Sequence, residues 1–161
     1  MNKTRYATYA AITAALYAAI TLATSFMAFG PIQFRVAEAM CVLPAYTTAS
    51  IPGLFIGCIL ANLIGGYGVW DVVVGSAATL FAALVTYALR RRSRFLWPLP
   101  SVLFNAFMVG VMLTYLSSVG GALWFNVLTV GAGQLLACYL VGIPLTYGLD
   151  RTRLFEEVQT R

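Results

Sequence analysis

The chain has 161 residues, of which 61% are hydrophobic and only 9% are charged, and its mean hydropathy is +0.85. Soluble domains carry roughly a quarter charged residues. The composition therefore excludes a soluble protein and indicates an integral membrane protein with one transmembrane domain, residues 1–161. The formal charge of +5 lies in clusters at loop positions, which is typical of membrane topology signals rather than of nucleic-acid binding.

The chain lacks the residues and motifs that many enzymes and metalloproteins use. It contains no histidine, the commonest general base and transition-metal ligand. Cys41, Cys58 and Cys138 lie inside apolar runs without metal-ligand spacing, so we interpret them as small buried hydrophobic residues. The sequence has no G-x-x-x-x-G-K-[ST] phosphate loop. We therefore expect no catalytic residue, metal site or cofactor, and any ATP hydrolysis would belong to another chain.

The first apolar segment, residues 6–28, is long enough to cross a hydrocarbon core of about 30 Å at about 1.5 Å per residue. Lys3 and Arg5 precede it, as in a signal peptide, but further apolar segments follow without a soluble mature domain. We interpret it as a retained membrane helix. Gly30 and Pro31 then interrupt this helix, because proline lacks the amide donor.

Residues 36–65 are mostly apolar and fit either one long tilted helix or two short helices. The basic clusters decide between these alternatives. Under the positive-inside rule, the clusters at residues 3–5 and 90–94 both face the cytoplasm, which requires an even number of crossings between them. The stretch therefore contains two crossings, residues 36–48 and 52–65.

Three further helices complete the prediction, at residues 70–89, 99–118 and 124–149. Gly120 and Gly121 form the turn between the last two helices. The expected fold is an all-α membrane protein, a bundle of six transmembrane helices with both termini in the cytoplasm.

The outer connections of this topology carry polar and aromatic residues. Arg35 falls in the first outer loop, and it is the one basic residue that the topology puts outside. Amphipathic aromatic side chains favour the membrane interface, and three of them flank the remaining outer connections. These three are Tyr67, Trp70 and Trp124.

Two rows of alanine run along the first helix. The Ala7 row consists of Ala7, Ala11, Ala15 and Ala19, and the Ala10 row consists of Ala10, Ala14 and Ala18. In lipid there is little hydrophobic drive to pair helices, so small residues matter because they let another backbone approach closely. The rows predict either packing against this protein's own helices or a docking face for a separate membrane subunit, and the pattern alone does not choose.

Arg35 and Glu38 are the candidate charged residues of a binding site. An ionisable group at the membrane edge costs enough free energy to be a functional candidate. Their spacing of three also allows them to pair with each other across one helical turn, which would be a structural role. Gln33 would add an amide beside them, and Phe34 would add a stacking face.

Asp71 lies at the outer end of the fourth helix, where it is either an N-cap or a second carboxylate facing the same outer pocket as Glu38. Buried amides in lipid usually bond to a neighbouring helix, and the alternative role is contact with a ligand. Three amide side chains lie inside the predicted third and sixth helices: Asn62, Asn126 and Gln134. We expect Asn105 nearer the cytoplasmic side, where it is a weaker site candidate.

Three segments of the chain form recognisable motifs: F-G-P-I-Q-F-R-V-A-E-A at residues 29–39, I-P-G-L-F-I-G-C-I-L-A-N-L at 51–63 and W-D-V-V-V-G-S-A-A-T-L at 70–80. These segments resemble the QueT family of membrane proteins. The resemblance covers nearly the whole chain, and its first two motifs are specific. The family in turn resembles the substrate-binding S-components of energy-coupling factor (ECF) transporters.

This resemblance implies a six-helix S-component in a bacterial cell membrane that binds its substrate near the outer face. It implies docking on one transmembrane coupling protein and two ATPases, and the Ala7 row is similar to the A-x-x-x-A pattern of that contact. The implied substrate is a queuosine precursor, a 7-substituted 7-deazaguanine. Glu38 or Asp71 would accept hydrogen bonds from its guanine-like edge, while Tyr67, Trp70 or Trp124 would stack on the ring.

Other functions remain open from the sequence. Some members that resemble this family are linked to cobalamin, so the substrate does not follow from membership. A second hypothesis is a non-transporting assembly subunit whose alanines bind a partner and whose outer polar groups satisfy each other. A stand-alone carrier is a third, because a sequence does not reveal partner ATPases, and a membrane enzyme is poorly supported without a catalytic set.

Overall fold

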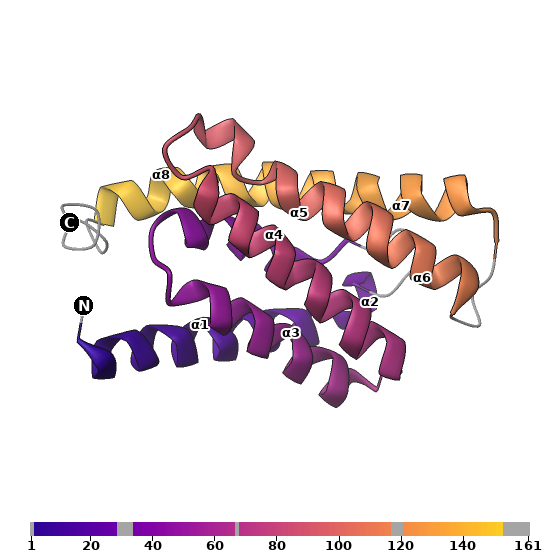
Figure 1. Ribbon diagram of the computed structural model, residues 1–161, viewed down its shortest axis with the longest axis horizontal. Helices are drawn as coiled ribbons and strands as arrows, with labels where there is room; N and C mark the ends of the chain where they lie inside the picture. Colours follow the sequence, from indigo (N-terminus) through magenta and orange to yellow (C-terminus); the bar gives the residue numbers. More distant parts are fainter. Residues whose placement is uncertain (1, 29–33, 67, 117–120, 153–161) are drawn as a thin grey trace.

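The computed structural model describes residues 2–28, 34–66, 68–116 and 121–152, and these residues contain helices and no strand. The helices form six rods packed side by side (Figure 1). The rods are α1 (Lys3–Ala23) with the short α2 (Ser25–Ala28); η1 (Val36–Ala45); α3 (Ser50–Gly65); η2 (Asp71–Gly75) with α4 (Ser76–Ala88); α5 (Leu99–Phe104), η4 (Asn105–Val109) and α6 (Gly110–Tyr115); and α7 (Leu123–Leu135), η5 (Leu136–Val141) and α8 (Gly142–Thr152). The predicted all-α bundle of six helices is confirmed for this part of the chain.

Four of the rods are long and apolar enough to cross a membrane: Lys3–Ala23, Asp71–Ala88, Arg94–Tyr115 and Leu123–Thr152. The other two, η1 and α3, are shorter apolar helices. The division of residues 36–65 into two helices is therefore confirmed, and both are short, as expected. Large apolar side chains remain exposed along all the long rods, which is the pattern of a bundle surrounded by lipid.

The first rod differs from its predicted bounds of residues 6–28. It begins at Lys3, because the Asn2 side chain caps it by accepting from the amide of Arg5 at 2.9 Å. It is interrupted at Thr24, whose hydroxyl and amide both bond to the carbonyl of Ile20. The predicted break at residues 30–31 lies outside the described residues.

The second rod, η1, was expected as an α-helix over residues 36–48, but it is a 3₁₀-helix that ends at Ala45. Such a helix rises about 2.0 Å per residue, so ten residues extend over roughly 20 Å. Pro44 contributes no amide donor near its end. Eight of the ten residues are buried, and η1 contacts α1, α3, α4, η5 and α8. This rod therefore runs through the interior of the bundle.

Close packing of α1 against α3 depends on two glycines of α3. A Cβ atom added to Gly53 would lie 2.7 Å from the carbonyl oxygen of Ala10, and one added to Gly57 would lie 2.8 Å from that of Ala14. Distances below 3.0 Å to a backbone atom leave no room for a side chain. The Ala10 row and these glycines thus let the two backbones meet, as small residues do in membrane helix pairs.

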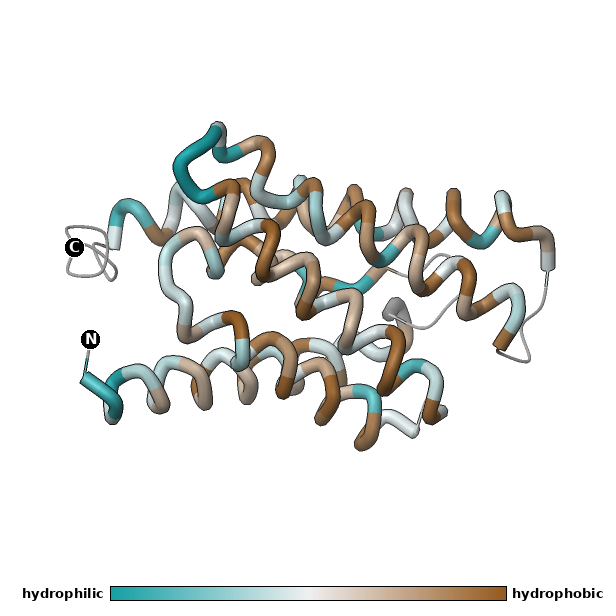
Figure 2. The backbone as a smooth tube through the Cα atoms, viewed as in Figure 1, coloured by the Kyte–Doolittle hydropathy of each residue, from teal (hydrophilic) through white to brown (hydrophobic). Residues whose placement is uncertain are grey.

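The start of α1, the connection after α4 and the end of α8 lie at one end of the molecule, on the left in Figure 1. The same end carries the hydrophilic residues of the connection and of the two helix ends (Figure 2). The connection, which contains η3 (Arg94–Leu96), is held against α8 by an ion pair between Arg94 and Asp150. Asp150 also accepts from the hydroxyl of Tyr46, just beyond η1, at 2.9 Å.

Candidate functional site

Two groups of polar side chains in the described bundle contain the charged residues of the predicted site. The first, which we call the outer group, contains Arg35, Cys58, Asn62 and Asp71. The second, which we call the inner group, contains Tyr17, Glu38, Ser101 and Asn105. Burying an ionisable residue between membrane helices costs free energy, and contacts of its polar atoms with other polar groups offset part of that cost.

The outer group joins η1, α3 and η2. Arg35 precedes the first residue of η1, is only 4% exposed, and lies with Nη1 3.8 Å from Cys58 Sγ and Nη2 3.4 Å from Asn62 Oδ1. The Asn62 amide donates to the main-chain carbonyl of Asp71 at 2.8 Å. The positive charge of Arg35 attracts the Asp71 carboxylate. A cation, an amide and a carboxylate are therefore brought together near the ends of α3 and η2.

The inner group is centred on Glu38, which is 2% exposed. The Tyr17 hydroxyl donates to Glu38 Oε1 at 2.5 Å, and the Ser101 hydroxyl donates to Oε2 at 2.7 Å. Asn105 donates to the Ser101 carbonyl at 2.9 Å and to its hydroxyl at 3.3 Å. Glu38 thus connects η1 to α1 and α5, and each of its two oxygens accepts a hydrogen bond.

The two groups lie at different depths. Asn62 of the outer group and Leu54, which lies beside Glu38, are eight residues apart on α3, or about 12 Å along the axis. The cavity around Glu38 measures about 10 Å³, roughly the space of one water molecule. It is lined by Tyr17, Glu38, Cys41, Leu54, Thr79, Ala82, Ala83 and Ser101. The inner group is consequently closed to a ring-shaped ligand in this arrangement.

The structure brings together three of the nine predicted substrate-site residues, because Arg35, Asn62 and Asp71 belong to the outer group. A fourth, Glu38, lies deeper, in the inner group. Arg35 and Glu38 have partners on other rods, in addition to any attraction between them. The alternative of an N-cap at Asp71 is not seen, because η2 starts without a side-chain cap hydrogen bond.

The other five predicted residues comprise two exposed tryptophans, one amide that bonds to α6 and two residues outside the described part of the chain. Trp70 is 48% exposed, and Trp124 is 68% exposed with its ring edge-on to Phe125. Asn126 donates to the hydroxyl of Thr114 on α6 at 2.9 Å, as expected of an amide that joins two membrane helices. Gln33 and Tyr67 lie outside the described residues.

Three contributors were missed by sequence reasoning: Tyr17, Cys58 and Ser101. Asn105 was treated as a weak candidate, and it joins the inner group through Ser101. A signal was present for Tyr17, which follows Thr13 and precedes Thr21 at intervals of four, so that polar groups line one face of α1. All three of these residues are buried.

The two alanine rows of α1 have different environments. Ala14 and Ala18 of the Ala10 row are buried and Ala10 is partly buried, whereas all four residues of the Ala7 row are exposed. The Ala10 row, which faces α3, therefore packs against one of this protein's own helices, the first of the two predicted roles. The Ala7 row remains uncovered in this chain.

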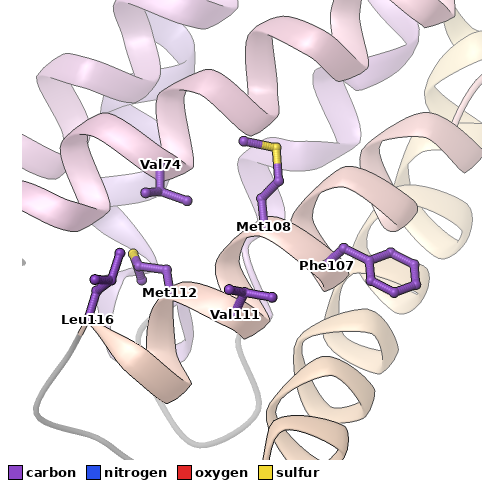
Figure 3. Close-up of a pocket in the computed structure, with 6 residues that line it drawn as sticks. All are labelled: Val74, Phe107, Met108, Val111, Met112 and Leu116. Carbon is purple, nitrogen blue, oxygen red and sulfur yellow. The ribbon is translucent and has the colours of Figure 1, made fainter.

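An apolar groove of about 350 Å³ lies between η2 and the rod formed by η4 and α6. Val74 points from η2 toward Met108 and Met112, while the ring of Phe107 points to the opposite side (Figure 3). The groove has almost no polar lining. Open grooves of this kind between membrane helices accept lipid chains, and nothing in it would orient a polar ring.

The described residues contain no cluster of three or more histidine, cysteine, aspartate or glutamate side chains that could hold a metal ion. Cys41, Cys58 and Cys138 are free and buried, as predicted. Cys58 also contacts Arg35 and the Thr79 hydroxyl, so its thiol is part of the polar interior.

Comparison with known proteins adds to this geometry. The sequence model of the QueT transporter family matches residues 7–151. The chain belongs to the QueT family. A relative in this family is the queuosine precursor transporter QueT of Lactococcus lactis subsp. cremoris (strain MG1363), which is 39% identical over 72 residues. That match covers 44% of this chain and 42% of the relative's length. No solved structure matches this QueT-family chain.

Family membership and the apolar rods together describe a multi-pass membrane protein of a transporter family. The QueT match extends over all six rods, so it covers the outer group, the inner group and the Ala7 row. The resemblance seen in the sequence motifs is thereby confirmed.

Proposed function

We propose that the chain is the substrate-binding S-component of an ECF-type importer in a bacterial cell membrane, and that it takes up a 7-substituted 7-deazaguanine. The relative named as a queuosine precursor transporter supports the substrate class. Membership in a transporter family supports the transport role, with ATP hydrolysis assigned to partner subunits. The N- and C-termini lie on the cytoplasmic side in this proposal.

The observation that carries the proposal is the outer group. Between three rods, the polar side chains of Arg35 and Asn62 lie near Asp71, which supplies a carboxylate. A polar heterocycle loses hydrogen bonds to water when it enters a protein interior, and these groups would replace them. A guanine edge presents two N–H donors beside a carbonyl acceptor, and it matches this combination of groups. A purely apolar site, such as the groove at Val74, would not distinguish such an edge.

The docking face in this proposal is the Ala7 row. Its exposure on α1, while the Ala10 row is used for packing on α3, leaves a strip of small residues on which another membrane helix could pack closely. The partner is one transmembrane coupling protein that carries two ATPases. The exposed apolar side chains Ile12 and Leu16 lie next to the row and would be covered with it.

Equilibrium binding to the purified protein tests the substrate. A 7-substituted 7-deazaguanine should bind saturably with one site per chain, and cobalamin should not compete. The absence of saturable binding, or tight binding of cobalamin, would overturn the substrate assignment. The closed interior already argues against a ligand as large as cobalamin within the inner group.

Replacement of Ala15 by leucine tests the docking face. The side chain is exposed, so the variant should fold and bind substrate like the wild type, but it should fail to co-purify with the coupling protein and to support uptake. Val85→Leu, at another exposed position, is the matched control and should behave like the wild type. Uptake by the chain without any energy module would instead indicate a stand-alone carrier.

An assembly subunit without transport activity is the second candidate, and the inner group favours it, because there the polar atoms satisfy each other. Co-purification with the coupling protein without binding of any ligand would be its signature.

A further inference from the structure

The two carboxylates of the site differ in what they contact. Both oxygens of Glu38 accept hydrogen bonds from hydroxyl groups, from Tyr17 at 2.5 Å and from Ser101 at 2.7 Å. The surrounding cavity of about 10 Å³ leaves space for roughly one water molecule. A ligand could reach Glu38 only by displacing these hydroxyls and separating η1 from α1 and α5.

Asp71 is in the opposite situation. Its main chain is held by the Asn62 amide at 2.8 Å, and its side chain is only partly buried. Among the described residues, no other side chain forms a hydrogen bond or an ion pair with its carboxylate, which bonds only to the backbone of Asp71 itself. The charge of Arg35 attracts it without forming such a pair. No other described side chain therefore occupies the acceptor positions of this carboxylate.

The local backbone strengthens this contrast. Asp71 is the first residue of η2, a π-helical turn at the start of the α4 rod. Isolated π-helical turns within α-helices occur frequently at functional sites, because the wider turn redirects side chains and carbonyl groups. Glu38 instead lies in the first turn of the buried η1, with one hydrogen-bond partner on α1 and another on α5.

We infer that Asp71 is the specificity-determining residue that reads the guanine edge, and that Glu38 is an internal hydrogen-bond acceptor that holds the bundle together. The inference rests on the proposed function, and it assigns ligand binding to Asp71 and a structural role to Glu38. The ring N–H and the exocyclic 2-amino group donate to the two oxygens of Asp71, while Arg35 donates to the ring carbonyl and Asn62 holds the main chain of Asp71. Recognition thus depends on the 2-amino group.

The test compares two probes that differ only in this group, 7-deazaguanine and 7-deazahypoxanthine. The wild type should bind 7-deazaguanine about 10- to 100-fold more tightly, the range expected for one hydrogen bond to a charged acceptor. Asp71→Asn keeps the size of the side chain but presents a donor to the ligand, so the ratio of the two dissociation constants should fall close to one. Glu38→Gln should keep the wild-type ratio and lower the thermal stability instead. Ser101→Ala removes one donor from Glu38 and serves as the second inner-group variant should Glu38→Gln not fold.

Each outcome either supports or overturns the assignment of Asp71 to the guanine edge. A ratio lost in Asp71→Asn and kept in the inner-group variants supports the inference. A ratio kept in Asp71→Asn, or lost in an inner-group variant, overturns it while the proposed function stands. Failure of the wild type to bind 7-deazaguanine overturns the inference, and failure to bind a 7-substituted 7-deazaguanine as well overturns the proposed function with it.

Discussion

Replacement of Gly57 by alanine should destabilise the bundle by forcing α1 and α3 apart. The added Cβ atom would lie 2.8 Å from the Ala14 carbonyl oxygen and 2.9 Å from the Tyr17 Cβ atom, and neither atom belongs to a flexible side-chain end. Overpacking of this kind costs about 1–3 kcal/mol. The intrinsic gain of alanine over glycine in a helix, about 1 kcal/mol, acts in the opposite direction.

Gly148→Ala is the matched control, because Gly148 lies in α8 with no atom within 4 Å of the added Cβ. It receives the same gain in helix propensity without crowding. The free energy of unfolding of Gly148→Ala should therefore exceed that of Gly57→Ala by about 1–3 kcal/mol. Denaturant unfolding in detergent, followed by circular dichroism, measures the difference. Equal stability of the two variants would refute the close packing of α1 on α3.

Three other changes test particular contacts by the same unfolding assay. Tyr46→Phe removes the hydroxyl that bonds to the Asp150 carboxylate and to the Thr146 carbonyl and should cost about 1.5–3 kcal/mol, whereas an unchanged stability would mean that these contacts contribute nothing. Asn62→Ala removes the donor to the Asp71 carbonyl and should cost about 1–3 kcal/mol and weaken ligand binding; retention of both properties would argue against the outer group. Ser76 has a buried hydroxyl without a partner in the described part of the chain, so Ser76→Ala should keep or raise stability, and a marked loss would reveal a contact of that hydroxyl.

The six rods were predictable because charge and length constrain a membrane protein strongly. The basic clusters required an even number of crossings before Arg90, and this separated η1 from α3 although the apolar run between residues 36 and 65 carries no charge after Glu38. The 3₁₀ geometry of η1 and the π-helical turns η2, η4 and η5 were not predictable. A segment that is apolar on all sides has no periodicity that distinguishes the bonding patterns of these helices.

The candidate site was predictable only in part. Arg35, Glu38, Asn62 and Asp71 stand out because polar groups are rare in apolar helices. Which of them meet depends on the rotation of each helix, and that rotation follows from packing contacts such as Gly57 on Ala14. Trp124 is exposed with its ring edge-on to Phe125, and its contact with a ligand stays a prediction.

A structure of the chain with a bound 7-substituted 7-deazaguanine tests the central claim most directly. The account predicts that the ring lies in the outer group, with its guanine edge within hydrogen-bond distance of the Asp71 carboxylate and with Arg35 at its carbonyl. A ligand in the apolar groove beside Val74, or one that contacts Glu38 after displacing Tyr17 and Ser101, would contradict it.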